Sequence, residues 1–313
     1  MSKSISVRKL AMCSLTAVVA AAASQGVFAH TRLETPIVLE NTKVHNRVNI
    51  GHGCPAGTAR KATFGTSVVF PNAVSYTPVI GVDSGSGKVY TSNPASTYLT
   101  TLAGIGALIR TGGPWQTTGI KADKLGNLDG FWAGGKAYDQ TISTPINIDF
   151  YSAAVKINPA SCARSVTFEL AIADFCDASV PGAAAKDEEI LYWSPIPNFT
   201  GVPGAPFGAA TADAARNVPV GPKYSNYDGY ADAAHTIAGD GWGSPATLKV
   251  VRNTTGTPAT LTSAAVAANP LPAGCTGNGG AGDDIYIYPS AEQINAELPI
   301  WSGTQQNGTN YWQ

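Results

Sequence analysis

Charged side chains are scarce in this chain. Asp, Glu, Lys and Arg together make up 13% of the 313 residues, about half the share found in an average soluble protein. The formal net charge is −1 at pH 7, whereas binding to the phosphate backbone of a nucleic acid needs a basic face. The composition therefore gives no support to a nucleic-acid partner.

The sequence also lacks short patterns that mark common catalytic sites. It contains no G-x-S-x-G nucleophile elbow and no P-loop. Ser and Thr are abundant, but none of them stands in a recognisable arrangement with a base. We therefore assign no catalytic residue, and a binding protein is favoured over an enzyme.

The chain has a single long apolar run, and it lies at the N-terminus. Three basic residues precede an apolar stretch at residues 10–23, which is too short to span a bilayer. Small residues ending at Ala29 fit a signal-peptidase site, with a cut after Ser24 as the alternative. We therefore expect residues 1–29 to be a secretory signal peptide, and the mature protein to be periplasmic, secreted or at the cell surface without a transmembrane segment.

Cysteine is the next scarce residue type. Four cysteines follow the expected signal: Cys54, Cys162, Cys176 and Cys275. An even number in an exported chain predicts two disulfides. No pair has the C-x-x-C spacing of a zinc ribbon or a thioredoxin site, and the sequence permits three pairings.

Alternating hydrophobicity dominates the chain up to about residue 198. Residues 165–172 and 145–151 each place apolar side chains on one face and polar ones on the other, which predicts half-buried strands. Shorter strand candidates lie at residues 47–50, 66–71, 246–252 and 283–289. Frequent Gly and Pro separate them. The fold class we expect is all-β, an antiparallel β-sandwich.

The pattern changes near residue 198. Residues 30–198 are expected to form the sandwich domain, and residues 199–313 a Gly/Ala/Pro-rich extension or second subdomain. One short helix is predicted in the extension, because Ser290 and Gln293 have capping-box spacing and Pro299 stops the helix.

His30 is the first candidate for a metal site, because a cut after Ala29 makes it the first mature residue. It then offers its α-amine and its imidazole from one residue, the arrangement called a histidine brace. The α-amine titrates near pH ~8, so a metal displaces its proton readily. Nitrogen donors of this kind suit Cu(II). A histidine that is merely tolerated at the first position is the alternative interpretation.

Two further histidines follow closely. The chain has four in all, and His45 and His52 stand within about 22 residues of His30. Glu34 lies four residues after His30, on the same face if this segment is a strand. The alternatives are an exposed polar side chain for His45 and a turn residue for His52. His235 lies in a poorly patterned region and is not assigned to the metal.

A calcium site has weaker support. Asp123, Asn127 and Asp129 resemble a calcium loop loosely, without EF-hand spacing or a closing Glu. The pairs Asp283–Asp284 and Asp228 with Asp232 offer carboxylates too, although turn residues explain all of these positions equally well.

In order along the chain, several segments resemble the YcnI-like periplasmic copper-binding proteins. The matching segments are HTRLE at residue 30, IGHGC at 50, GGPWQTTG at 112, FWAGGKAYDQT at 131, ADFCD at 173 and LYWSPIP at 191. The resemblance covers residues 30–198 and implies a small β-sandwich whose first residue binds copper.

The resemblance also implies particular residue roles. Copper is held by the amine and imidazole of His30, with Glu34 as the nearby carboxylate, for which Glu40 is a competitor, and with Trp193 beside the metal. It further implies that Cys54 pairs with Cys176, which leaves Cys162 to pair with Cys275.

A looser resemblance is to the surface copper proteins of the MopE/CorA type from methane oxidisers. It implies donors among His45 and His52, with Trp115, Trp132 or Trp193 beside them.

Three functions remain open from the sequence. The first is an exported copper-binding protein for acquisition, storage or delivery, whose partners are the copper ion and another periplasmic or outer-membrane copper protein. The second is a copper mono-oxygenase with a histidine brace, in which His45 or His52 is the extra ligand. The third is a secreted adhesive or surface protein without a metal.

Overall fold

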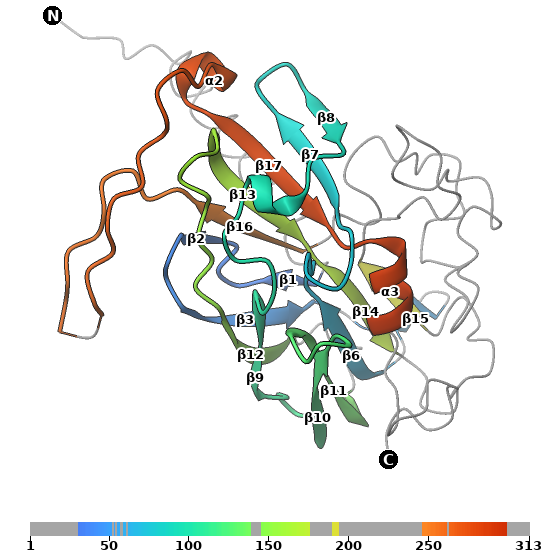
Figure 1. Ribbon diagram of the computed structural model, residues 1–313. Helices are drawn as coiled ribbons and strands as arrows, with labels where there is room; N and C mark the ends of the chain where they lie inside the picture. The colour runs from blue at the N-terminus through green and yellow to red at the C-terminus, as the bar shows by residue number, and fades with distance from the viewer. Residues whose placement is uncertain are drawn as a thin grey trace, which may run out of the picture.

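A computed structural model of the chain describes residues 31–51, 53, 55–56, 59–60, 62–138, 145–175, 190–193, 246–261 and 263–298 (Figure 1). Most regular structure in these residues is β-strand, arranged in three larger sheets and one small hairpin. The predicted all-β class is confirmed. The expected signal peptide, His30, His52, Cys54 and Cys176 lie outside the described residues.

The first sheet has four strands in the order β1 (Arg32–Leu33), β3 (Val44–Ile50), β12 (Ile146–Ser152) and β9 (Gly106–Thr111). All neighbours are antiparallel. On β12 the predicted alternation is confirmed, because Ile146, Ile148 and Phe150 are buried, while the residues between them are more exposed.

The second sheet has five strands, all antiparallel to their neighbours. The order is β10 (Thr117–Ala122), β11 (Leu128–Tyr138), β6 (Thr63–Val69), β14 (Ala171–Phe175) and β15 (Ile190–Trp193).

The third sheet has six strands and is mixed. The order is β2 (Ile37–Leu39), β16 (Thr247–Val251), β13 (Ala163–Glu169), β17 (Asp283–Tyr288), β7 (Val79–Asp83) and β8 (Lys88–Thr91). The pairs β13–β17 and β16–β2 are parallel.

Strands β16 and β17 come from beyond the domain boundary expected near residue 198. β17 lies between β13 and β7 (Figure 1), and β16 pairs with β13 on the other side. Residues 247–251 and 283–288 are therefore built into a sheet whose other strands come from residues 37–169. The bridge Cys162–Cys275, with a Cα–Cα distance of 5.5 Å, joins the same two parts of the chain and agrees with the pairing that the family resemblance implies.

The remaining elements are small. They are the hairpin of β4 (Pro55–Ala56) and β5 (Ala59–Arg60), the 3₁₀ turn η2 (Ala95–Thr97), and the helices α2 (Gly277–Gly280) and α3 (Ala291–Glu297). The predicted start of α3 is confirmed, because the Ser290 hydroxyl accepts a hydrogen bond of 3.1 Å from the backbone N–H of Gln293. No helix in the described ranges has the length and apolar character needed to cross a bilayer.

The strand predicted at residues 165–172 differs from the structure in two ways. The chain ends β13 at Glu169 and starts β14 at Ala171, so it passes from the third sheet to the second. The face that carries Thr167 and Glu169 is buried as well. The prediction of a half-buried strand is therefore wrong, because β13 is an interior strand between β16 and β17 and neighbouring structure covers its polar face too.

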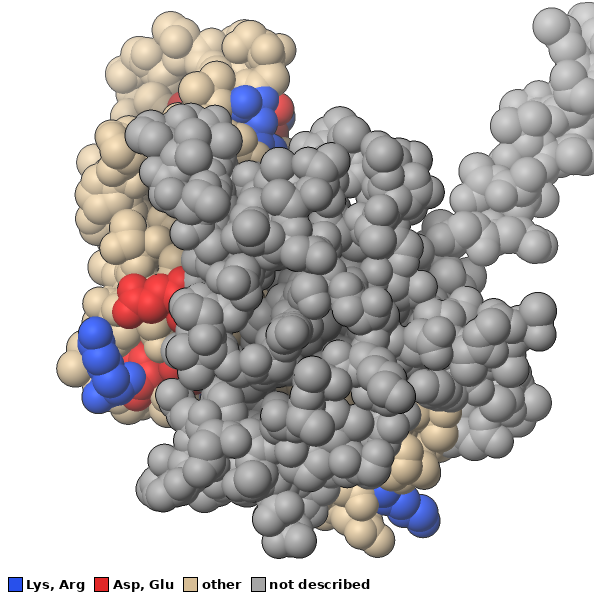
Figure 2. Space-filling model, turned by 90° about the vertical axis from the view of Figure 1, so that its right-hand side faces the viewer, with Lys and Arg blue, Asp and Glu red and all other residues tan. Residues whose placement is uncertain are grey.

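The sheets share one hydrophobic core. The ring of Phe150 on β12 lies 5.2 Å from that of Phe131 on β11 and 5.7 Å from that of Phe70, centroid to centroid. These contacts join the inner face of the first sheet to the second sheet, as in a β-sandwich. Charged side chains are few among the described residues visible on the face in Figure 2, and they form no large patch of one sign there.

Candidate metal centre

A buried carboxylate lies where the N-terminal strand meets the second sheet. Asp174 stands in the middle of β14, between β6 and β15, and has no exposed surface. Its Oδ2 accepts hydrogen bonds from the Thr31 hydroxyl at 2.7 Å and from the Trp193 indole N–H at 2.8 Å. Its Oδ1 accepts a hydrogen bond from the Thr66 hydroxyl at 2.5 Å.

The hydrogen bonds from Thr31, Thr66 and Trp193 to Asp174 come from neutral groups. Burial raises the pKa of Asp174 to about 6, although the hydrogen bonds from Thr66, Thr31 and Trp193 act in the opposite direction. A positive charge close to a buried carboxylate stabilises its ionised form and lowers its pKa. A cation bound beside Asp174 would therefore gain from this carboxylate.

Thr31 places the N-terminal segment at this carboxylate. Its side chain is buried together with Leu33, whereas Glu34 faces outward. His30 precedes Thr31 directly in the sequence. The residue predicted to carry the brace is therefore covalently next to a residue that is bonded to Asp174.

The carboxylates proposed from the sequence are engaged elsewhere. Glu34 is exposed, and its Oε2 lies 3.2 Å from Nη1 of Arg47. Glu40 is fully buried and accepts hydrogen bonds from the backbone N–H groups of Ile157 and Asn253 and from the Asn269 amide. Glu40 thus ties three segments of the fold together, which explains its burial without a metal.

Sequence reasoning missed Asp174. The available signal was a single ionisable residue inside the apolar run that became β14, which is buried along its whole length. An acid at such a position needs polar partners, and the sequence does not show which segments supply them. Trp193, in contrast, was predicted to lie near the metal, and the structure brings it to the same carboxylate as Thr31.

His45 lies in a different place. Arg32 on β1 is paired with Asn49 on β3, and His45 stands four residues further along β3, roughly 13 Å at the rise of a strand. Its Nε2 is 4.0 Å from Asp149, and its ring lies 5.5 Å from the ring of Tyr151. The structure therefore does not bring His45 together with Thr31.

The other two candidate tryptophans have separate environments. Trp115 is buried and donates its indole N–H to the Thr63 carbonyl at 3.3 Å. Trp132 packs across β10 against Gly119, where an added Cβ would lie 2.2 Å from the indole nitrogen.

The loop proposed for calcium is organised by hydrogen bonds. The Asp123 carboxylate accepts from the N–H groups of Leu125 and Asn127, from the Asn127 and Asn72 amides and from the Ser75 hydroxyl. This arrangement makes Asp123 a turn-forming residue. Over the described ranges, no group of three or more His, Cys, Asp or Glu side chains is placed to hold a metal ion.

Comparison with known proteins adds little to this picture. No protein-family model matches the chain, and no curated protein does so significantly. Among solved structures, the chain is similar to a type II cohesin domain from the cellulosome of Acetivibrio cellulolyticus, with 16% sequence identity and a TM-score of 0.19. That match covers 52% of this chain and 81% of the cohesin domain. At this TM-score the likeness supports no argument about function.

Proposed function

We propose that this is an exported copper-binding protein, acting in copper acquisition, storage or delivery, which holds its cargo ion at the mature N-terminal His30. The observation that carries the proposal is the shared carboxylate. Thr31, which follows His30, and Trp193 both donate hydrogen bonds to Oδ2 of Asp174. Hydrogen bonds thus join the residue after the proposed brace, a buried carboxylate and a tryptophan.

The chemistry of these groups suits copper. The α-amine and imidazole of a terminal histidine are nitrogen donors, which bind Cu(II) more strongly than other divalent first-row ions. A nearby carboxylate balances part of the ion's charge, and the buried position of Asp174 strengthens that attraction relative to a carboxylate in water. No catalytic group is assigned in this proposal.

The structure distinguishes two candidates for the carboxylate. Asp174 is bonded to Thr31, whereas Glu34 is exposed and paired with Arg47. We therefore expect Asp174 to matter more than Glu34 for copper affinity. Replacement of each acid by its amide keeps the volume and removes the charge, so that the two variants form a matched pair.

The decisive experiment uses protein whose first residue is His30, verified by mass spectrometry. Cu(II) affinity is measured by competition with a chromophoric chelator, and the donor atoms by electron spin resonance. We expect one copper per chain with nitrogen-rich parameters. A single Met placed before His30 should weaken binding by at least a hundredfold, because the amine is displaced from the chelate.

Three substitutions complete the experiment. Asp174→Asn should weaken binding more than Glu34→Gln, and His45→Gln should leave it unchanged. Unaltered affinity after the Met extension would refute the brace. Protein that takes up no copper with either terminus would instead support a secreted surface protein without a metal.

A further inference from the structure

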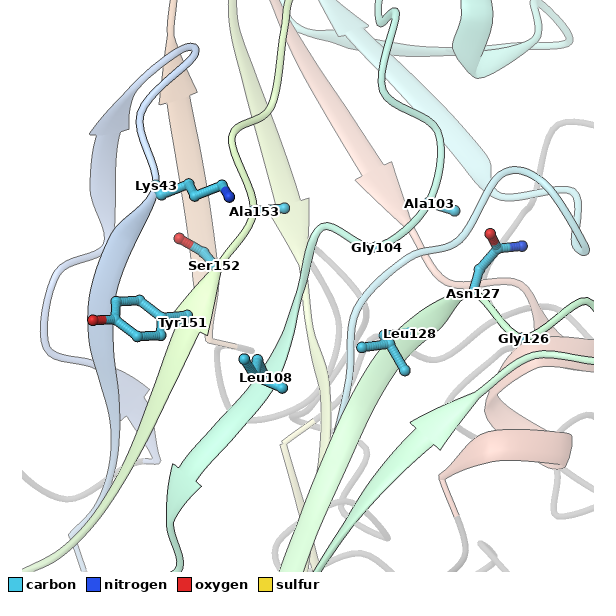
Figure 3. A pocket seen from close by; sticks show the side chains of 10 residues that line it. All are labelled: Lys43, Ala103, Gly104, Leu108, Gly126, Asn127, Leu128, Tyr151, Ser152 and Ala153. Atoms are coloured by element: carbon cyan, nitrogen blue, oxygen red, sulfur yellow. The ribbon is translucent and has the colours of Figure 1, made fainter. Parts of the chain in front are cut away.

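A pocket of about 740 Å³ is lined by residues of the first and second sheets. Thr31, Asp174 and Trp193 are not among these residues. One side is formed by the facing ends of β9 and β12 together with Lys43, just before β3. The opposite side is formed by the turn at Gly126–Asn127 and by Leu128, the first residue of β11 (Figure 3). Its size falls in the range of about 300–1,000 Å³ typical of small-molecule sites.

The register of the first sheet explains why this space is open. The pairing of β12 with β9 shifts between Tyr151 and Ser152, so that Tyr151 faces Leu108 but Ser152 faces Gly106. A shift of this kind leaves one residue of β9 without a partner and bends the strand. The extra residue bends β9 beside the three residues of and after β12 that line the pocket, Tyr151, Ser152 and Ala153. The pairing resumes beyond it, since the Ala153 N–H donates to the Ile105 carbonyl at 2.9 Å.

The lining is largely apolar. Leu108, Leu128, Ala103 and Ala153 contribute aliphatic groups, and the side chain of Leu108 is 54% exposed. Tyr151, the cross-strand partner of Leu108, is 39% exposed. Burial of such apolar surface by a ligand is favourable by about 25 cal/mol per Å² before the cost of association.

The charge of the lining has one sign. Lys43 is exposed, no acid of the described residues forms an ion pair with it, and Figure 3 shows its side chain reaching toward Ala153. Among the described residues that line the pocket there is no Asp or Glu. Arg110 adds a second cation at the rim, since its guanidinium lies 4.8 Å from the ring centre of Tyr151 and donates a 2.9 Å hydrogen bond to the phenol oxygen.

Three acids lie close in sequence to lining residues, and each accepts hydrogen bonds elsewhere. Glu40 is buried and accepts from the N–H groups of Ile157 and Asn253. Asp129 is buried and accepts from the Asn72 and Gln293 amides, and Asp149 accepts from Arg47 at 2.7 Å. An anionic ligand could therefore pair with Lys43, and the largely apolar lining favours one with an apolar body.

We propose that this pocket binds a small amphiphilic carboxylate, whose anionic head pairs with Lys43 and whose apolar body covers Leu108 and Leu128. A cationic amphiphile is disfavoured, since it would meet Lys43 and Arg110 without a compensating acid in the lining. This site is independent of copper, so the proposal stands or fails separately from the proposed function.

The test uses decanoate as the probe, below its critical micelle concentration, and isothermal titration calorimetry on the full mature chain. Decyltrimethylammonium and decanol are the comparison ligands, with the same chain length but opposite or no charge. We expect one decanoate per chain and at least tenfold weaker binding of the other two. A charge-assisted hydrogen bond of the usual strength accounts for a tenfold difference.

Two variants and their controls locate the site. Lys43→Gln should weaken decanoate binding about tenfold. Its control is Lys136→Gln, because Lys136 is exposed and lies near the C-terminal end of β11, and this variant should bind decanoate as the wild type does. Leu108→Asp should abolish binding, whereas Ile120→Asp, at a 53% exposed position on β10, should not.

The outcomes separate clearly. Absence of decanoate binding, equal binding of decanol, or decanoate affinity within twofold of wild type in both Lys43→Gln and Leu108→Asp would overturn the proposal. Circular dichroism and thermal unfolding of each variant show whether it is folded, so that a loss through misfolding is not counted as support.

Discussion

Trp193 donates its indole N–H to Oδ2 of Asp174 over 2.8 Å, and both side chains are almost completely buried. The two residues also sit on adjacent strands, since Trp193 pairs with Ile172 and Asp174 with Leu191 across β14 and β15. The bond therefore links the edge strand β15 to the interior of the second sheet through a charged acceptor.

Removal of this bond should destabilise the protein. Trp193→Phe keeps an aromatic side chain but leaves the carboxylate of Asp174 with one donor fewer, so the free energy of unfolding should fall by about 1–3 kcal/mol. Urea denaturation at pH 7 measures this change. Trp115→Phe is the control, because its 3.3 Å bond goes to the neutral carbonyl of Thr63 and should be worth less. A smaller loss for Trp193→Phe than for Trp115→Phe would contradict the assignment.

Asp129 makes the stability pH-dependent. It is buried on β11, and its Oδ2 accepts hydrogen bonds of 3.3 Å from the Asn72 and Gln293 amides, while its Oδ1 has no hydrogen-bond partner among the described residues. Burial, with the charge of Glu297, raises the pKa of Asp129 to about 7 from an ordinary 3.8. Lys121 and Asp123 also act on this carboxyl, the first lowering and the second raising its pKa.

The sign of the effect follows from proton binding. The folded protein holds a proton on Asp129 at pH values where the unfolded chain releases it, so this contribution to stability is complete below about pH 4 and is lost as the pH rises to about 7. Asn does not titrate, so Asp129→Asn should not show this loss. The unfolding free energy of the wild type minus that of the variant should therefore fall by a few kcal/mol from pH 4 to 7.5. Urea titrations at several pH values measure it.

Asp123→Asn supplies the control for this pH series. Burial of Asp123 is outweighed by hydrogen bonds from Ser75, Asn127 and Asn72, which hold its pKa well below the usual range. Its own contribution to stability is therefore lost only as the pH falls below about 4. The difference from wild type should change much less between pH 5 and 7 than for Asp129→Asn, with a small change remaining because the charge of Asp123 raises the pKa of Asp129. A flat profile for Asp129→Asn as well would show that Asp129 is ionised in the folded protein.

The Cys162–Cys275 bridge should contribute strongly to stability. It joins residues 113 apart in the sequence, and in the chain-entropy model closure of a loop of about 100 residues is worth about 4.7 kcal/mol. The double variant Cys162→Ser/Cys275→Ser should lose unfolding free energy of this order, measured by urea denaturation without reductant. A loss below about 1 kcal/mol would show that the burial and pairing of β16 and β17 hold the C-terminal region without the bridge.

Several elements were predictable from local sequence. The period of two in residues 145–151 predicts β12, because adjacent side chains of a strand point to opposite faces. The start of α3 was also predictable, because Ser290 caps a backbone N–H only three residues away. These features depend on contacts within one segment, or on the difference between a buried and an exposed face.

Other features were decided by the tertiary structure alone. Which strands become neighbours depends on contacts between distant residues, so the sequence did not predict that β17 lies between β13 and β7 or that two strand pairs are parallel. The polar face of β13 is buried for the same reason.

The candidate site shows the same division. The sequence by itself singled out His30 as the start of the mature chain and Trp193 as its companion, through composition, the cleavage pattern and a family resemblance. Only the fold selects Asp174, because the donors Thr31, Thr66 and Trp193 come to it from three separate segments. A buried carboxylate depends on donors that folding brings together, and local patterns carry no information about such donors.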